Sequence, residues 1–153
     1  MSPRQAVDAV TADIRDHHIT ADGTGPFNAM RHIDLLCHLT ARMAADAEYQ
    51  IASNIAYLPP AATLGASAGH LGRAVAHYTQ ALAPLITLTT TAQDTLQQKL
   101  DSLDHHSRLR IHLDDASRAL TAARTALEVP RPPAASSASA PGPLHAPAAR
   151  RRA

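Results

Sequence analysis

Apolar residues near the end of the chain follow the α-helical period closely. They recur at alternating intervals of four and three: Leu109, Leu113, Ala116, Leu120, Ala123 and Leu127. This spacing places all of these side chains on one stripe of a helix, which needs other helices to cover it. The pattern predicts a helix over residues 107–128, with Leu113 and Leu120 buried.

Earlier segments show the same period less clearly. A first helix is expected over 2–18, because Ser2 followed by proline is a typical helix start. After a loop over 19–26, a second helix is expected over 26–58, where two consecutive prolines follow. Its predicted apolar stripe is Ile33, Leu36, Thr40, Met43, Ala47, Ile51, Ile55 and Leu58. The glycine-containing segment 65–69 is expected to lead into a third helix.

The third helical segment contains Pro84, which lacks a backbone N–H and clashes with the preceding turn. The sequence therefore predicts either a kink or the start of a new helix at this point. Residues 85–91 are rich in β-branched side chains, but no second strand exists to pair with them, so a strand is rejected. Helical spacing resumes over 96–103. A turn is expected within 101–107, but this segment has no Gly or Pro, which leaves a continuous final helix as the alternative.

These segments together predict an all-α protein, with four main helices in a mostly antiparallel four-helix bundle over residues 1–128. Residues 129–153 contain six of the eleven prolines among Ala and Ser. Such a composition buries too little apolar surface to offset the entropy of ordering, so a disordered tail is expected. The tail has four arginines and no acidic residue, whereas 1–128 has thirteen acidic and ten basic side chains.

The composition indicates how large the side chains of the core are and in which cellular compartment the protein is expected. Aromatic residues make up only 3% of the chain, and much of the 45% hydrophobic content is alanine, so a thin core is expected. The single cysteine, Cys37, follows Leu35 and Leu36 and is expected to be buried and unreactive. The N-terminal segment lacks the apolar stretch of a signal peptide, and no run is long enough to cross a membrane. A cytoplasmic protein is therefore expected.

Ten histidines make a metal or acid–base site the strongest candidate for chemistry. The possible ligand pairs are Asp34 with His38, His70 with His77, and His105 with His112. Asp34 and His38 also belong to a polar stripe that is typical of surface ion pairs: Arg31, Asp34, His38, Arg42 and Asp46. The sequence has no HExxH motif, no nucleophile motif and no Gly-rich phosphate loop. We therefore expect no metal, no cofactor and no catalytic residue.

An alanine-rich amphipathic bundle is typical of a module that binds other proteins or itself. The prediction is a non-enzymatic protein-interaction or oligomerisation module, with a homodimer or a protein partner packed along the second and third helices. Tyr49, Tyr57 and Tyr78 are the predicted anchors, because aromatic residues are favoured at the centres of interfaces.

The alternative function is that of a small accessory DNA-binding protein. Arg150, Arg151 and Arg152 would then contact phosphates, without reading the base sequence. A continuous arginine face would favour nucleic acid, whereas an exposed apolar stripe would favour a protein partner. No membrane partner is expected.

Overall fold

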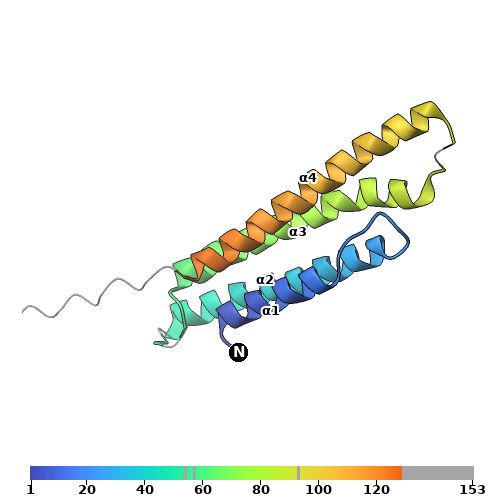
Figure 1. Ribbon diagram of the computed structural model, residues 1–153. Coiled ribbons are helices and arrows are strands. Elements are labelled where there is room, and N and C mark those ends of the chain that lie inside the picture. The colour runs from blue at the N-terminus through green and yellow to red at the C-terminus, as the bar shows by residue number, and fades with distance from the viewer. Residues whose placement is uncertain (54, 57, 93, 129–153) are drawn as a thin grey trace, which may run out of the picture.

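The computed structural model describes residues 1–53, 55–56, 58–92 and 94–128, and its helices lie alongside one another (Figure 1). The helices are α1 (Pro3–Asp16), α2 (Gly25–Ser53), α3 (Ala61–Thr90) and α4 (Leu96–Ala126). The predicted all-α bundle is confirmed, and the described residues include no strand. The predicted disordered tail, 129–153, lies outside the described residues.

Neighbouring helices run antiparallel, because the contacts between them pair early residues of one helix with late residues of the next. The pairs that show this are Asp13 with Arg31 and Met1 with Arg42 for α1 and α2, Asp8 with Arg124 and Arg4 with Glu128 for α1 and α4, and Ser67 with Ala123 and His77 with Asp115 for α3 and α4. At the start of α2, Ala29 joins Ala81 and Leu85 near the end of α3. These contacts confirm the mostly antiparallel arrangement that the short connections predicted.

Two capping boxes set the starts of α1 and α4. The Ser2 hydroxyl accepts a hydrogen bond from the Gln5 backbone N–H (3.2 Å), and the Gln5 side chain accepts one from the Ser2 backbone (2.8 Å). Thr95 and Gln98 repeat this arrangement at α4. α4 then continues unbroken through 101–107, so the continuous alternative is confirmed and the chain turns just before Thr95 instead.

α3 neither ends nor restarts at Pro84. The missing backbone donor is tolerated because Pro84 is buried and the adjacent Leu85 is fully enclosed, so packing favours the helix. The threonines that follow satisfy their own hydroxyls within the helix, since the Thr87 hydroxyl donates to the carbonyl of Ala83 (3.0 Å) and that of Thr90 to the carbonyl of Ile86 (2.8 Å). The rejection of a strand over 85–91 is confirmed.

Two helix boundaries differ from the prediction. α2 ends at Ser53 rather than near residue 58, and beyond it the Gln50 side chain accepts a hydrogen bond from the Ile55 backbone N–H (3.0 Å). α3 begins at Ala61, directly after the second proline, so segment 65–69 lies inside the helix. The prolines therefore mark the start of α3, and the glycines do not.

The loop between α1 and α2 is held by Asp22. Its carboxylate accepts hydrogen bonds from the hydroxyls of Thr20 (2.7 Å) and Thr24 (2.6 Å) and from the Thr24 backbone N–H (2.8 Å). These donors, the Thr24 hydroxyl above all, lower the pKa of Asp22 to about 2. Gly25 then starts α2, where a Cβ atom would collide with the Thr20 carbonyl oxygen. Glycine is therefore required at this position.

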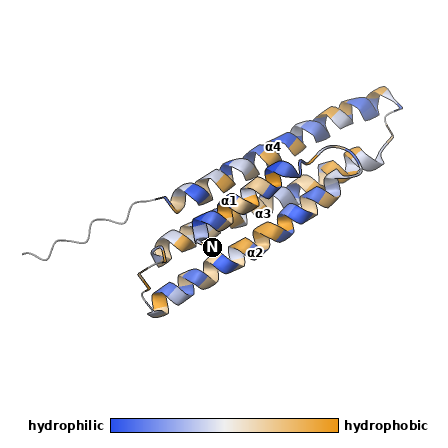
Figure 2. Cartoon of the chain, turned by 60° about the horizontal axis from the view of Figure 1, so that its bottom comes forward, coloured by the Kyte–Doolittle hydropathy of each residue, from blue (hydrophilic) through white to orange (hydrophobic). Residues whose placement is uncertain are grey.

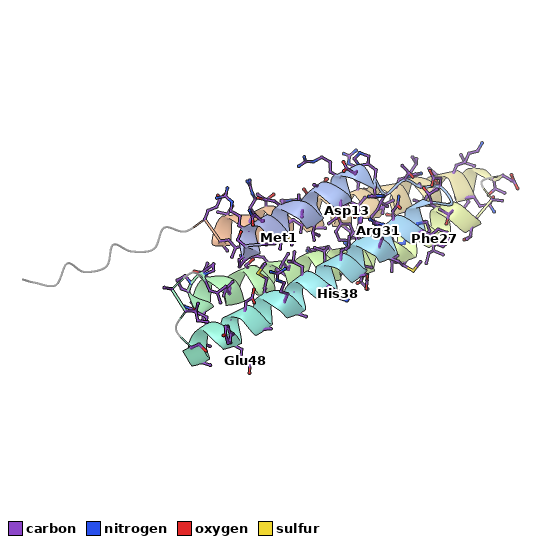
Figure 3. All side chains as sticks on the ribbon, turned by 90° about the horizontal axis from the view of Figure 1, so that it is seen from below. Met1, Asp13, Phe27, Arg31, His38 and Glu48 are labelled. Atoms are coloured by element: carbon purple, nitrogen blue, oxygen red, sulfur yellow. The ribbon has the colours of Figure 1, made fainter. Side chains whose placement is uncertain are left out.

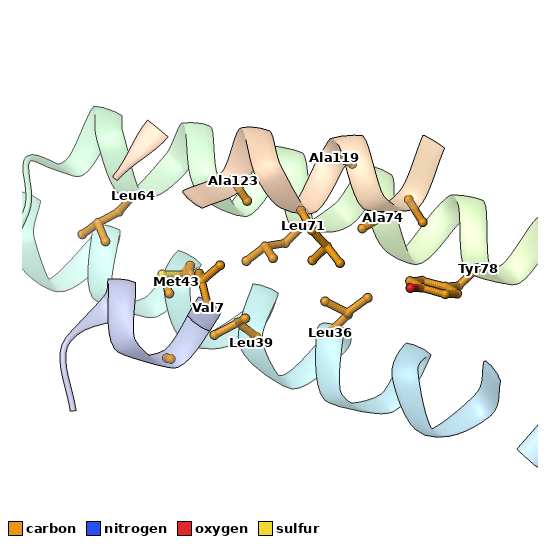
Figure 4. Close-up of a cluster of buried hydrophobic side chains, with 13 residues drawn as sticks. Val7, Leu36, Leu39, Met43, Leu64, Leu71, Ala74, Tyr78, Ala119 and Ala123 are labelled. Atoms are coloured by element: carbon orange, nitrogen blue, oxygen red, sulfur yellow. The ribbon is translucent and has the colours of Figure 1, made fainter. Parts of the chain in front are cut away.

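The core is thin, as predicted, and alanines supply much of it (Figure 4). Its larger group contains Ala6, Val7, Leu36, Leu39, Met43, Leu64, Leu71, Ala74, Tyr78, Ala116, Ala119, Leu120 and Ala123. A smaller group contains Ala29, Ala81, Leu85 and Leu109. Leu120 is buried as predicted, whereas Leu113 is only half-buried. Figure 2 shows hydrophilic residues between the hydrophobic ones along every helix, the pattern of amphipathic helices.

The helices have unequal lengths. α1 has 14 residues, whereas α2, α3 and α4 have 29, 30 and 31. At the usual rise this is about 21 Å against about 45 Å, so α1 covers only part of the groove between α2 and α4. The tip of the α3–α4 hairpin extends past the α1–α2 loop (Figure 1). Leu96, Leu100 and Leu103 on that tip remain exposed.

Candidate interaction surface and buried histidine

The three tyrosines predicted as anchors lie in different environments. Tyr49 is exposed (53%) near the end of α2. Tyr78 is 4% exposed and belongs to the core, and this burial raises its pKa to about 12. Tyr57 lies outside the described residues. Tyr49 is thus the one described tyrosine that a partner could reach directly.

A stripe of small and apolar residues follows the outside of α2 and α3, and we call it the outer face. It contains Met30, Cys37, Ala41, Ala44 and Ile51 of α2, and Gly65, Gly69, Gly72, Ala76, Ala83 and Ile86 of α3. All are exposed except Gly72, which is partly exposed. Arg31 and Arg42 of α2 contact the α1 segment, and His77 of α3 contacts α4, so α1 and α4 lie on the other sides of the two helices.

The outer face carries very little charge. Arg73 is the only Asp, Glu, Lys or Arg residue in α3, and its guanidinium is hydrogen-bonded to His70. On α2, Asp34 and Glu48 are the carboxylates at the spacing of the stripe, and Asp34 pairs with His38 (3.4 Å). A solvent-exposed helix face normally carries charged residues, whereas the centre of a protein interface is depleted of them. The α3 half of the outer face therefore has the composition of an interface.

The three glycines of the outer face have no structural role within the chain. A Cβ atom added at Gly65, Gly69 or Gly72 would meet nothing within 4 Å. Each glycine inside a helix costs roughly 0.5–1 kcal/mol relative to alanine. Glycines in a helix allow another backbone to approach closely, and no part of the described chain uses this space.

The position of Cys37 corrects the prediction of a buried thiol, because its side chain is exposed. The buried stripe of α2 runs through Ala29, His32, Leu36, Leu39, Met43 and Gln50. Cys37 follows Leu36 by one residue and so points away from the core. The predicted apolar stripe of α2 is also wrong near the end of the helix, where Ile51 is 77% exposed.

The histidines do not assemble a metal centre among the described residues, where no group of three His, Cys, Asp or Glu side chains converges. His38 and Asp34 form an exposed pair (3.4 Å). One member of each of the other two candidate pairs meets across helices, since the rings of His77 of α3 and His112 of α4 lie 6.3 Å apart. Their helices had to pack before this pair could form.

Arg31 forms the clearest ion pair, and it contacts α1 rather than its own helix (Figure 3). Its Nε and Nη2 atoms donate to the two carboxylate oxygens of Asp13, at 3.0 and 2.6 Å. The hydrogen bonds from Arg31 lower the pKa of Asp13. The predicted surface stripe on α2 is therefore partly a link between helices.

Most arginines of the bundle are neutralised by carboxylates. Those that pair are Arg4, Arg31, Arg42, Arg108, Arg118 and Arg124. Arg118 pairs with Asp115 (3.1 Å). The described residues thus form no continuous basic face, and Arg150, Arg151 and Arg152 lie outside them.

His32 is the residue that the sequence analysis overlooked. It is 1% exposed, and neither ring nitrogen has a hydrogen-bond partner among the described residues. Tyr78 meets the ring edge-on, with centroids 5.3 Å apart. The available signal was its position in the buried stripe of α2, four residues before Leu36.

Comparison with known proteins finds no family model, no curated protein and no solved structure that matches the chain. None of the helices among the described residues is long and apolar enough to span a membrane.

Proposed function

We propose that this protein is a non-enzymatic interaction module that forms a homodimer through the outer face of α2 and α3. The observation that carries this proposal is the combination of exposure and small size along both helices, with a single charged residue in α3. Two such faces can approach closely along α3 without burying a charged residue at the centre of the contact.

A second copy of the chain is the partner that this surface fits best. A two-fold dimer uses the same patch on both subunits, so every exposed residue of the face is covered at once. With the two-fold axis perpendicular to α2, the two Glu48 carboxylates lie at opposite ends of the interface, and each Asp34 is paired with His38 of its own helix. Met30, Ile51 and Ile86 then add apolar area at its ends.

Sedimentation across a wide range of protein concentrations tests the proposal. We expect wild-type protein to associate reversibly, and Ala76→Arg to stay monomeric because it places a charge in the centre of the face. Ala66→Arg, at an exposed alanine of the same helix outside the outer face, is the matched control and should associate normally.

A wild-type protein that is monomeric throughout would overturn the homodimer, as would equal weakening by both variants. The nucleic-acid alternative depends on Arg150, Arg151 and Arg152, and the paired arginines of the bundle lend it no support. Salt-dependent DNA binding by the full chain, lost when these three are changed to alanine, would favour that alternative.

A further inference from the structure

The first part of α4, residues 96–107, has its apolar side turned away from the rest of the bundle. Its one buried residue is Ser102, whereas Leu96, Leu100 and Leu103 are 76%, 52% and 65% exposed. The residues that face the end of α3 are polar and line a small cavity there: Gln98, Asp101, Ser102 and His105. A helix that packs only on its own bundle has the opposite arrangement, with its apolar stripe inside.

A groove continues from this leucine stripe along α4. It lies between α4 and the α1–α2 loop, and its volume is about 710 Å³. Apolar side chains of both walls line it: Ile19 and Ala21 of the loop, and Leu103, Leu109, Ile111 and Leu113 of α4. Leu103 belongs to both the stripe and the groove. The two therefore form one continuous surface, which we call the tip surface.

The tip surface lies where a longer α1 would cover α4. The ion pairs of α1 with Arg124 and Glu128 place it on the second half of α4, and it ends at Asp16. Beyond that point the tip of the α3–α4 hairpin extends past the α1–α2 loop (Figure 1). The uncovered length from Leu96 to Leu113 is about 25 Å, which accommodates a helix of about 17 residues.

The charges of the tip surface favour a partner that carries carboxylates. Lys99 precedes Leu103 by one turn, and Arg110 lines the groove. Neither cation forms an ion pair with a described carboxylate, whereas the nearby Asp104 is already paired with Arg108 (2.9 Å). Asp114 is the one carboxylate that lines the groove. Positive charge therefore exceeds negative charge along this surface.

A second copy of the chain fits the tip surface less well than a separate helix does. If two leucine stripes met with antiparallel helices, the side that carries Lys99 and Arg110 would face the same side of the other copy. If they met with parallel helices about a two-fold axis, the groove would stay empty, because it lies to one side of the stripe. A separate helix can contact the stripe, the groove and both cations together.

We propose that the tip surface binds an amphipathic helix of another protein, with carboxylates along one edge of its apolar side. Apolar side chains of that helix, three and four residues apart, pack on Leu96, Leu100 and Leu103 and enter the groove. Its carboxylates lie beside Lys99 and Arg110. This surface belongs to α4 and the α1–α2 loop, so it stays open when the outer face of α2 and α3 forms the proposed dimer.

Two designed helical peptides of about 18 residues test the proposal. Both carry leucines at three- and four-residue spacing, and the edge beside the leucines carries glutamates in one peptide and lysines in the other. By fluorescence anisotropy with the full chain, we expect the acidic peptide to bind at least about tenfold more tightly than the basic one. Its affinity should fall as salt is added, because the cations are exposed.

Three variants locate the binding. Leu100→Ser should weaken binding of the acidic peptide by about tenfold, and the fold should persist because this side chain is exposed. Arg110→Glu should weaken the acidic peptide and strengthen the basic one, a reversal that mere damage to the surface would not produce. Arg118→Glu, at an exposed arginine of α4 beyond the groove, is the matched control and should bind both peptides as wild type does.

The proposal is overturned if the acidic peptide does not bind at millimolar concentration or if the basic peptide binds equally well. It is also overturned if Leu100→Ser and Arg110→Glu leave binding unchanged. Loss of self-association in Leu100→Ser would overturn it too, because a second copy would then cover the tip surface. Ala76→Arg, which breaks the proposed dimer, should bind the acidic peptide normally, so failure of the dimer and failure of this proposal are distinguishable.

Discussion

The two sides of the bundle differ in how completely the chain covers them. Along the α2/α3 side, two long helices pack against each other, and their outer surface is made of small and apolar residues with few charges. Along the α1/α4 side, a helix half as long leaves a cleft, and ion pairs link its ends to α2 and α4. One side has an apolar surface without a partner, and the other has a buried polar group without one.

The bundle therefore consists of a closely packed unit of α2, α3 and α4 and an added short helix, α1. α3 lies between α2 and α4 and carries most of the core with them. α1 adds Ala6 and Val7 to that core, and its remaining links to the bundle include exposed ion pairs, which contribute little to stability. We therefore expect the largest mutational effects at α3 and α4, and smaller ones at α1.

The largest effect is expected in the shared core. Leu120→Ala should lower the free energy of unfolding by about 2–5 kcal/mol, because it leaves a cavity among buried residues. Leu113→Ala, at a half-buried position in the cleft wall, should cost less. Urea unfolding of both variants measures the difference. Equal losses would contradict the distinction between a closed core and an open wall.

A smaller effect is expected at His32 and depends on pH. The pKa of His32 is lowered in the folded protein, so below its ordinary value of 6.5 the unfolded chain binds a proton more readily than the folded chain. The contribution of neutral His32 to the free energy of unfolding is therefore fully present above pH 6.5, and it falls as the pH drops toward the pKa of the folded protein. The groups that influence His32 are Asp13, His17, Arg31 and, by packing, Tyr78.

His32→Leu should abolish this part of the pH dependence. At about pH 5 the variant should be more stable than wild type by about 1–3 kcal/mol, since an unpaired buried group is also removed. Thermal unfolding from pH 8 to pH 5 provides the measurement, with His38→Leu as the control. A variant that loses stability on acidification as steeply as wild type would show that other groups cause the effect.

The glycines of the outer face should give opposite results in the monomer and the dimer. Gly69→Ala should stabilise the isolated chain by about 0.5–1 kcal/mol, because nothing in the chain occupies the added Cβ position. The same change should weaken self-association by keeping the two backbones apart. Unfolding at low concentration and sedimentation at high concentration separate the two effects. Stronger association would remove the glycines from the interface.

The smallest effect is expected at the link between α1 and α2. Asp13→Asn removes the charge that Arg31 binds, yet both side chains are partly exposed and solvent screens the pair. Its contribution should be present above pH 4 and be lost on acidification, because the folded pKa of Asp13 is lowered. Melting temperatures at neutral pH and in acid should therefore differ less for the variant than for wild type. The reverse result would assign the acid sensitivity to other carboxylates.

The helices could be predicted from local sequence patterns, because helix formation depends on residues close together in the chain. The helical spacing of apolar residues, the prolines and the Ser2 cap predicted the all-α class. The capping box formed by Thr95 and Gln98 is the sequence signal for the start of α4. Which side of each helix is covered depends on how the helices pack against one another. This packing buried His32 rather than Cys37, joined Arg31 to Asp13, brought His77 to His112 and kept Pro84 within a helix. Each of these depends on contacts between distant segments, whose energies outweigh local preference and are not encoded in the spacing of any one helix.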